Sequence, residues 1–148
     1  ELEIELLLDK DVNEIKVGTD LAVVLDIPII YFDFDKSDIR PSAALELEKI
    51  ITVLKQHPSM KIDVRSHTDS RGTFRYNDDL SNRRNKATID HIINVGGIDS
   101  NRLTGKGYGE SQLVNKCNGR IPCSETDHQL NRRSEFIVVS IGVDAEKE

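Results

Sequence analysis

The segment His67-Thr68-Asp69-Ser70-Arg71-Gly72 sets an acid beside a glycine, and Arg84 follows it along the chain. A carboxylate at Asp69 suits an ammonium group, and a guanidinium at Arg84 suits a carboxylate. Together the two charges predict a clamp for a small zwitterion. Simpler uses exist, because a turn aspartate commonly accepts backbone amides, and an Asp69–Arg84 ion pair could be purely structural.

The acid is expected to lie directly after a strand. Met60, Ile62 and Val64 alternate with polar residues, which predicts a strand with one buried face over 60–66. Gly72 then supplies the backbone freedom for a sharp exit. We expect His67 to be a packed, hydrogen-bonded neighbour, because its surroundings supply neither a metal-ligand set nor a nucleophile.

The arginine is expected on a helix over 77–95, which Gly96-Gly97 ends. Arg84 lies four residues after Leu80 and three before Ala87, so it belongs to the apolar stripe of this helix. A guanidinium on that stripe points inward and needs a partner. Arg83, one step round the helix, is expected in solvent.

The remaining patterns predict an α+β domain with two helices on one mixed sheet. Strands are expected at 29–34, 102–107 and 135–141, the last apolar on both faces and therefore interior to the sheet. A second helix is expected from Pro41 to His57, where the following proline ends it.

The 148 residues suffice for one ordinary core. We expect residues 1–26 to be an N-terminal arm or the tail of a preceding domain, 27–143 to be the domain itself, and 144–148 to be a tail. The first residue is Glu, so the sequence is expected to be a fragment. Its longest apolar runs are too short to cross a bilayer.

Composition disfavours a nucleic-acid partner. The net charge is −6, with 26 acidic residues against 20 basic ones, whereas binding to phosphates needs a basic surface. The pairs Arg83-Arg84 and Arg132-Arg133 lie among polar residues without interleaved aromatics. These pairs are therefore candidates for specific anion contacts.

Two cysteines, Cys117 and Cys123, enclose a short polar loop. A disulfide is the favoured interpretation, since it would fix a segment with little core of its own. Free thiols are an alternative, and so is a zinc site with Asp127 and His128, although zinc ligands usually include more closely spaced cysteines.

Asp33-Phe34-Asp35 at the end of an apolar run supports a rival function. Haloacid-dehalogenase-like, Mg-dependent phosphatases carry such an Asp-x-Asp pair, in which the first acid is the nucleophile. Here Lys36-Ser37 follows Asp35, unlike the pattern of that family. The phosphatase is therefore kept only as an alternative.

Over residues 27–141 the chain resembles the OmpA-like peptidoglycan-binding domains shared by OmpA, Pal and MotB. Five motifs carry the resemblance in order: Tyr31-Phe32-Asp33-Phe34-Asp35; His67-Thr68-Asp69 with Gly72; Tyr76-Asn77, Leu80-Ser81 and Arg84; Gly107-Tyr108-Gly109-Glu110; and Asn131-Arg132-Arg133. Ser66 departs from the glycine that many members carry there.

The resemblance implies an OmpA-like βαβαβ(β) fold and non-catalytic binding of the diaminopimelate residue in peptidoglycan stem peptides. Asp69 and Arg84 would be the principal ligand-holding residues. Matched positions imply a supporting role for Arg133. They also imply that the ligand pocket is lined by Phe34, Asp35, Thr68, Arg71, Asn77 and Leu80.

The same resemblance implies no cofactor and a place at the periplasmic face of the outer membrane. The domain would anchor an outer-membrane or periplasmic protein to the cell wall, and would reach the membrane only through regions before residue 1. A pocket of this fold co-opted for a protein partner is the other alternative.

Overall fold

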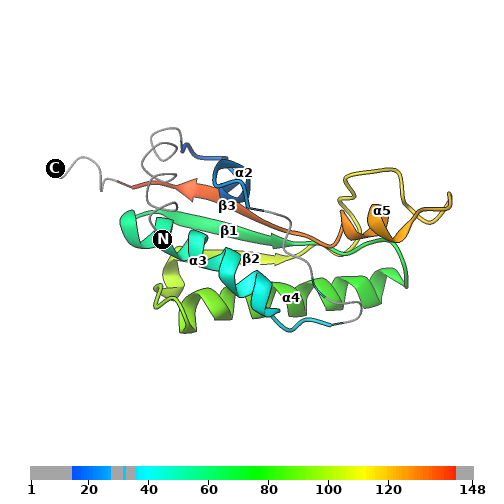
Figure 1. Ribbon diagram of the computed structural model, residues 1–148, viewed down its shortest axis with the longest axis horizontal. Coiled ribbons are helices and arrows are strands. Elements are labelled where there is room, and N and C mark those ends of the chain that lie inside the picture. The colour runs from blue at the N-terminus through cyan, green and yellow to red at the C-terminus, as the bar shows by residue number, and fades with distance from the viewer. Residues whose placement is uncertain (1–14, 28–31, 33–35, 143–148) are drawn as a thin grey trace.

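The computed structural model describes residues 15–27, 32 and 36–142 (Figure 1). The strand expected at 29–34 lies outside the described residues, except for Phe32. The described helices and strands, in chain order, are α2 (Leu21–Val24), α3 (Pro41–Gln56), β1 (Lys61–Ser66), α4 (Phe74–Asn94), the 3-10 helix η2 (Ser100–Arg102), β2 (Leu103–Gly107), α5 (Glu125–Gln129) and β3 (Ser134–Ser140).

The described strands form one mixed sheet in the order β2-β1-β3. β1 pairs with β2 in parallel and with β3 in antiparallel orientation. This arrangement confirms the predicted α+β class. The strand predicted at 135–141 was expected in the interior of the sheet, but among the described strands β1 takes that position. The edge of β3 that faces away from β1 contacts residues 18–20 through backbone hydrogen bonds and a bridge.

Helix α4 connects β1 to β2 and runs alongside them (Figure 1). It begins at Phe74, earlier than the predicted Asn77, because Thr73 caps it: the Thr73 hydroxyl accepts the amide N–H of Tyr76 at 3.1 Å. Apolar periodicity begins only at Leu80, so the pattern alone missed this polar first turn. The helix ends close to the predicted position.

Helix α4 lies so close to β2 that the last residue of the strand, Gly107, has no room for a side chain. A Cβ added at Gly107 would lie 2.2 Å from Ser81 Oγ and 2.4 Å from the backbone nitrogen of Asn82. The same contact is fixed by hydrogen bonds, because Asn82 Oδ1 accepts the Gly107 amide and Ser81 Oγ accepts the Gly109 amide. These contacts therefore fix the position of α4 relative to β2.

Helix α3 starts with Pro41 at its first turn, as predicted, and its C-terminal end is held by an arginine. Arg102 donates to the carbonyl oxygens of Leu54, His57 and Met60 at 2.6, 2.7 and 2.9 Å. The Leu54 and His57 carbonyls lie at the end of α3, where the last carbonyls lack partners within the helix, so the guanidinium helps to complete this end. The His57 carbonyl also accepts the Met60 amide at 2.9 Å. The contact of Arg102 joins α3 to the start of β2.

One hydrophobic core lies among α3, α4 and the sheet. The described part of residues 1–26 contributes to it, because Ile15, Leu21 and Leu25 are buried with residues of the later elements. Besides these three, the buried members are Ile27, Ala43, Leu47, Ile50, Ile51, Val53, Leu54, Met60, Ile62, Val64, Ile92, Ile98, Leu103, Phe136 and Val138.

Within the described part of the chain, each helix is too short or too polar to cross a membrane.

Candidate functional site

A cavity of about 320 Å³ opens where β1 ends and α4 begins. Its volume lies at the small end of the range for ligand sites. The predicted residues that the structure describes, Arg133 and the cysteines apart, all contribute to its lining, which consists of Thr68, Asp69, Arg71, Gly72, Tyr76, Asn77, Leu80, Arg84 and Arg132.

Asp69 is the buried acid of the cavity. Its Oδ1 accepts the backbone amide of Arg71 at 2.9 Å, which is the turn role considered above. Its Oδ2 accepts Arg71 Nη2 and Arg132 Nη1, each at 2.7 Å. Burial alone would raise the pKa of this carboxyl, but the hydrogen bonds from the two arginines outweigh burial and leave the pKa below its ordinary value.

Arg84 is the largest fully buried side chain among the described residues, and its place on the apolar stripe predicted this burial. Its Nε donates to the carbonyl oxygen of Lys36 at 2.8 Å, and its guanidinium carbon lies 4.9 Å from the centroid of the Phe32 ring. This cation–π contact and the hydrogen bond fix the guanidinium at the cavity wall. Arg83 is exposed and pairs with Asp79 on the helix surface.

Asp69 and Arg84 therefore share one cavity, but the ion partners of Asp69 are Arg71 and Arg132. The cavity combines one carboxylate with three guanidinium groups. Such a lining can hold a ligand that carries at least one carboxylate, and can offer Asp69 to an ammonium.

Asn77 and Leu80 come from the first turns of α4 and are both buried. Asn77 Nδ2 donates to the Asp69 carbonyl oxygen at 3.2 Å and to Glu110 Oε1 at 2.7 Å, so it ties the turn after β1 to the helix. Leu80 gives the cavity an apolar wall.

The turn after β1 carries the remaining predicted residues. Thr68 is buried, and its amide donates to the Gly109 carbonyl oxygen at 2.9 Å. Gly72 has a φ of 93°, as its expected role in a sharp exit requires. Phe34 and Asp35 lie outside the described residues.

Arg132 was predicted only as one of a pair of candidate anion contacts, and the sequence analysis gave the supporting role at the site to Arg133 instead. The Arg132 side chain is only 5% exposed and bonds Asp69. Arg133 instead donates to the carbonyl oxygen of Gln112 at 3.0 Å and approaches Glu135 at 3.4 Å, outside the cavity lining. The Asn131-Arg132-Arg133 element gave the signal, but adjacent residues point in different directions.

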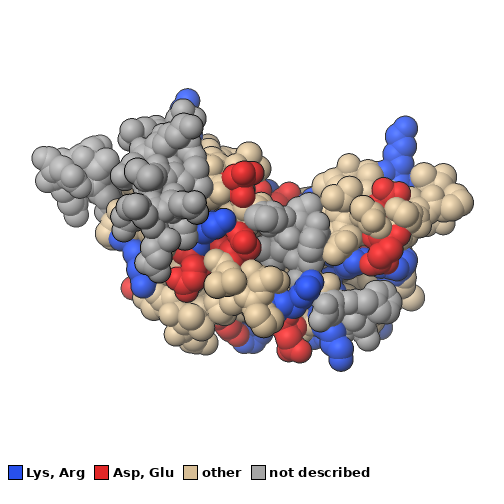
Figure 2. Space-filling model, viewed as in Figure 1, with Lys and Arg blue, Asp and Glu red and all other residues tan. Residues whose placement is uncertain are grey.

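Glu125 is a residue of the site that the sequence did not identify. It is the first residue of α5, a helix that lies between the expected strands at 102–107 and 135–141, where no helix was predicted. Its two carboxylate oxygens accept Arg71 Nη1 at 3.0 Å and Arg132 Nη2 at 2.6 Å. The hydrogen bond from Arg132 holds the pKa of Glu125 below its ordinary value. Figure 2 shows acidic and basic side chains side by side over the end of the molecule that carries α5.

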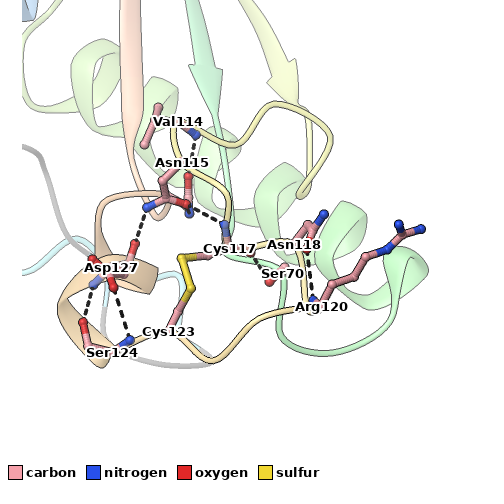
Figure 3. Close-up of a disulfide and its surroundings, with 10 residues drawn as sticks. Ser70, Val114, Asn115, Cys117, Asn118, Arg120, Cys123, Ser124 and Asp127 are labelled. Carbon is pink, nitrogen blue, oxygen red and sulfur yellow. Dashed lines mark hydrogen bonds between the residues drawn. A yellow bond between two sulfur atoms is a disulfide. The ribbon is translucent and has the colours of Figure 1, made fainter.

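A capping box starts α5 and was visible in the sequence. Ser124 Oγ accepts the amide of Asp127, and the Asp127 carboxylate accepts the amide of Ser124. Asn115 adds a further tie, because its Nδ2 donates to the Asp127 carbonyl oxygen at 2.9 Å (Figure 3). The first residue of α5 is thus held at the rim of the cavity.

Cys117 and Cys123 form a disulfide, as favoured from the sequence (Figure 3). Free thiols at these positions are excluded, and so is the zinc alternative, because both sulfurs are bonded to each other even though Asp127 lies near them. Ser70 Oγ donates to the Cys117 carbonyl oxygen at 2.5 Å. The disulfide loop is therefore attached to the same turn that presents Asp69.

His67 is a packed residue, as expected. Its Nε2 lies 3.0 Å from Glu135 Oε1, and its ring stacks on Tyr108 at 5.5 Å between centroids. This hydrogen bond lowers the pKa of Glu135. The imidazole braces the turn from outside the cavity lining.

The sheet, the two helices and the charged cavity at the end of β1 define an α+β ligand-binding domain. The model of the OmpA family matches residues 31–122, and the chain belongs to this family. Domains of the OmpA, Pal and MotB type are non-catalytic binding domains, so the phosphatase alternative at Asp33 and Asp35 is not supported.

Relatives agree with this assignment. Outer membrane porin F of Pseudomonas aeruginosa is 40% identical over 94 residues, which cover 64% of this chain and 26% of the porin. The peptidoglycan-associated lipoprotein of Brucella melitensis is 34% identical over 113 residues, which cover 76% of this chain and 64% of the lipoprotein. The chain thus spans less than two thirds of either relative.

Solved structures share the fold. The peptidoglycan-associated lipoprotein from Burkholderia pseudomallei superposes with a TM-score of 0.67 at 25% identity. The match covers 77% of this chain and 92% of the lipoprotein chain.

Proposed function

We propose that this domain binds peptidoglycan without catalysis, through the diaminopimelate residue of the stem peptide. It would anchor an outer-membrane or periplasmic protein to the cell wall, at the periplasmic face of the outer membrane. Membership of the OmpA family supports this function, as do two relatives that are named peptidoglycan-associated lipoproteins.

The observation that carries the proposal is the cavity in which Asp69 faces guanidinium groups. The free end of diaminopimelate holds an ammonium and a carboxylate on one carbon. Asp69 would accept the ammonium, and Arg84 would donate to the carboxylate as a charge-assisted pair. Both protein groups are buried and anchored, so little ordering is needed when the ligand enters.

The ammonium must share Asp69 with arginines that already bond it. Arg71 is the partner that can move, because its side chain is 37% exposed whereas that of Arg132 is 5% exposed. Exchanging a guanidinium for an ammonium at Asp69 keeps the carboxylate paired and therefore gains little net free energy. Affinity on the order of micromolar to millimolar follows, and the many repeats of the wall would raise it by multivalency.

The spacer of the ligand would lie against the apolar side of the cavity. Leu80 supplies apolar surface for the methylene groups, with Thr68 and Asn77 beside it. Phe34 and Asp35 are proposed as further contacts on the resemblance alone.

Sedimentation with purified peptidoglycan tests the function. We expect Asp69→Ala and Arg84→Ala each to reduce the bound fraction at least tenfold. Asp79→Ala and Arg83→Ala are matched controls, because they remove an exposed acid and the neighbouring exposed arginine on α4. Binding by the two cavity variants at the level of the controls would refute the function.

Calorimetry tests the ligand. A diaminopimelate-type stem should bind more tightly than a lysine-type stem, whose side chain ends in an ammonium without the carboxylate. Equal affinity for the two stems would exclude recognition of both charges, even if the wall itself were bound.

A further inference from the structure

The cavity carries more positive charge than a zwitterion can balance. Arg71, Arg84 and Arg132 line it, against the single carboxylate of Asp69. The head group proposed above adds one positive and one negative charge, so the excess remains after it binds. A ligand that fits this cavity should bring a further anionic group.

In the free protein, the carboxylate of Glu125 already neutralises part of this excess positive charge. Glu125 accepts from Arg71 Nη1 and Arg132 Nη2, the guanidinium nitrogens that face away from Asp69. The Glu125 side chain is 61% exposed, whereas the Arg132 side chain that it bonds is nearly inaccessible. An exposed carboxylate on a flexible side chain is the member of this network that a ligand can replace at least cost.

The buried arginine also retains an unused donor. Among the described residues, Arg132 Nε is buried and has no hydrogen-bond partner. The two terminal nitrogens of the same guanidinium are engaged by Asp69 and Glu125. Because a buried N–H without an acceptor is costly, this group favours a ligand that brings another acceptor.

We propose that Arg71 and Arg132 form a second anion subsite, which Glu125 fills in the free protein and a second carboxylate of the ligand fills in the complex. This inference rests on the proposed diaminopimelate site. Diaminopimelate has a second carboxylate at its other end, separated from the head group by methylene groups. The carboxylate is free only where the peptide main chain ends at diaminopimelate, so the subsite selects trimmed stems over longer ones.

A matched pair of probes tests the subsite. Both are diaminopimelate with one amine acetylated and the opposite head group intact. In the first probe the carboxyl group of the acetylated end is free, and in the second it is an amide. Calorimetry on the wild-type domain should show about three- to tenfold tighter binding of the free carboxylate.

The variant Glu125→Gln distinguishes two roles for Glu125: competing with the ligand carboxylate, or only positioning Arg71 and Arg132. If Glu125 competes with the ligand, its removal should tighten the free-carboxylate probe and widen the ratio of the two affinities by about threefold or more. Asp79→Asn is the control, because it removes the same charge from an exposed acid that pairs with Arg83 on α4. It should leave the ratio at the wild-type value. Circular dichroism before each titration establishes that the exposed substitutions leave the fold intact.

Each other outcome overturns a specific part. Equal wild-type affinities for the two probes would remove the second subsite but leave the head-group site standing. Weaker binding of both probes by Glu125→Gln, with their ratio unchanged, would show that Glu125 only positions the arginines. Failure of both probes to bind the wild type would refute the diaminopimelate site itself.

Discussion

Arg132 Nη1 and Asp69 Oδ2 form an ion pair of 2.7 Å between residues that are 63 positions apart in the sequence. The pair joins the turn after β1 to the segment between α5 and β3, and both side chains are nearly buried. The acid of the site is therefore held from the C-terminal part of the chain.

Arg132→Lys should weaken binding of a diaminopimelate-type stem by about tenfold or more. A guanidinium spans the carboxylates of Asp69 and Glu125 with separate nitrogens, whereas an ammonium cannot reproduce that geometry. Calorimetry measures the loss. Arg133→Lys, one residue along and outside the cavity lining, should change affinity less than threefold. Equal losses in the two variants would contradict this assignment.

Binding and stability should both depend on the ionised form of Asp69 in acid. Its pKa is lowered in the fold, so its stabilising contribution is present above the ordinary value of about 3.9 and is lost as the pH falls through the lower, folded value. Asp69→Asn should thus be less stable than wild type at pH 7, and the gap should narrow below about pH 4. Thermal melts across this range measure it; a gap that is constant with pH would contradict the role.

The disulfide should stabilise the domain by about 2 kcal/mol, the value expected for closing a short loop. The double variant Cys117→Ser, Cys123→Ser removes it, and urea unfolding measures the change. Reducing agent should lower the stability of wild type to that of the variant without affecting the variant. A response of the variant to reductant would show that another process is being measured.

Arg102→Met should lower the free energy of unfolding by about 2–4 kcal/mol, because the carbonyl groups of Leu54, His57 and Met60 lose the hydrogen bonds of the guanidinium. Arg120→Met, in the exposed loop, should stay within about 0.5 kcal/mol of wild type. Chemical denaturation compares the two. Similar small changes in both would mean that the helix end is satisfied without Arg102.

Gly107→Ala should cost about 3 kcal/mol or more, since the new methyl group would meet Ser81 and the backbone of Asn82. The first turns of α4 would shift with it, so binding should fall too. Gly119→Ala is the comparison: its Cβ meets no atom within 4 Å, and it bears only the strain of a φ of 94°, about 1–2 kcal/mol. Equal stability of the two variants would show that α4 can move away from β2.

Local patterns sufficed to predict the elements that carry Asp69 and Arg84. Alternation marked β1, and the spacing from Leu80 placed Arg84 on the inner face of α4, where it is buried. These signals work because each depends on a single face of a single element. The positions of Phe34 and Asp35 remain predictions.

What the sequence could not indicate was how distant segments converge. Arg132 and Arg133 are indistinguishable by type, and only the turn before β3 decides which one bonds Asp69. Glu125 lies on a helix too short for a periodic signal, and its role depends on two arginines from different segments. Such contacts are set by tertiary packing, which periodicity does not report.

The pairing of β3 has a mechanical consequence. Gly18 and Asp20 contact β3 near Val138, which pairs with the first half of β1, whereas the cavity lies beyond the last residue of β1. Tension between a bound wall and the segment at residue 18 would act lengthwise along both strands. The hydrogen bonds between antiparallel strands run perpendicular to the strands. They would share that load and fail together under shear instead of peeling apart one after another.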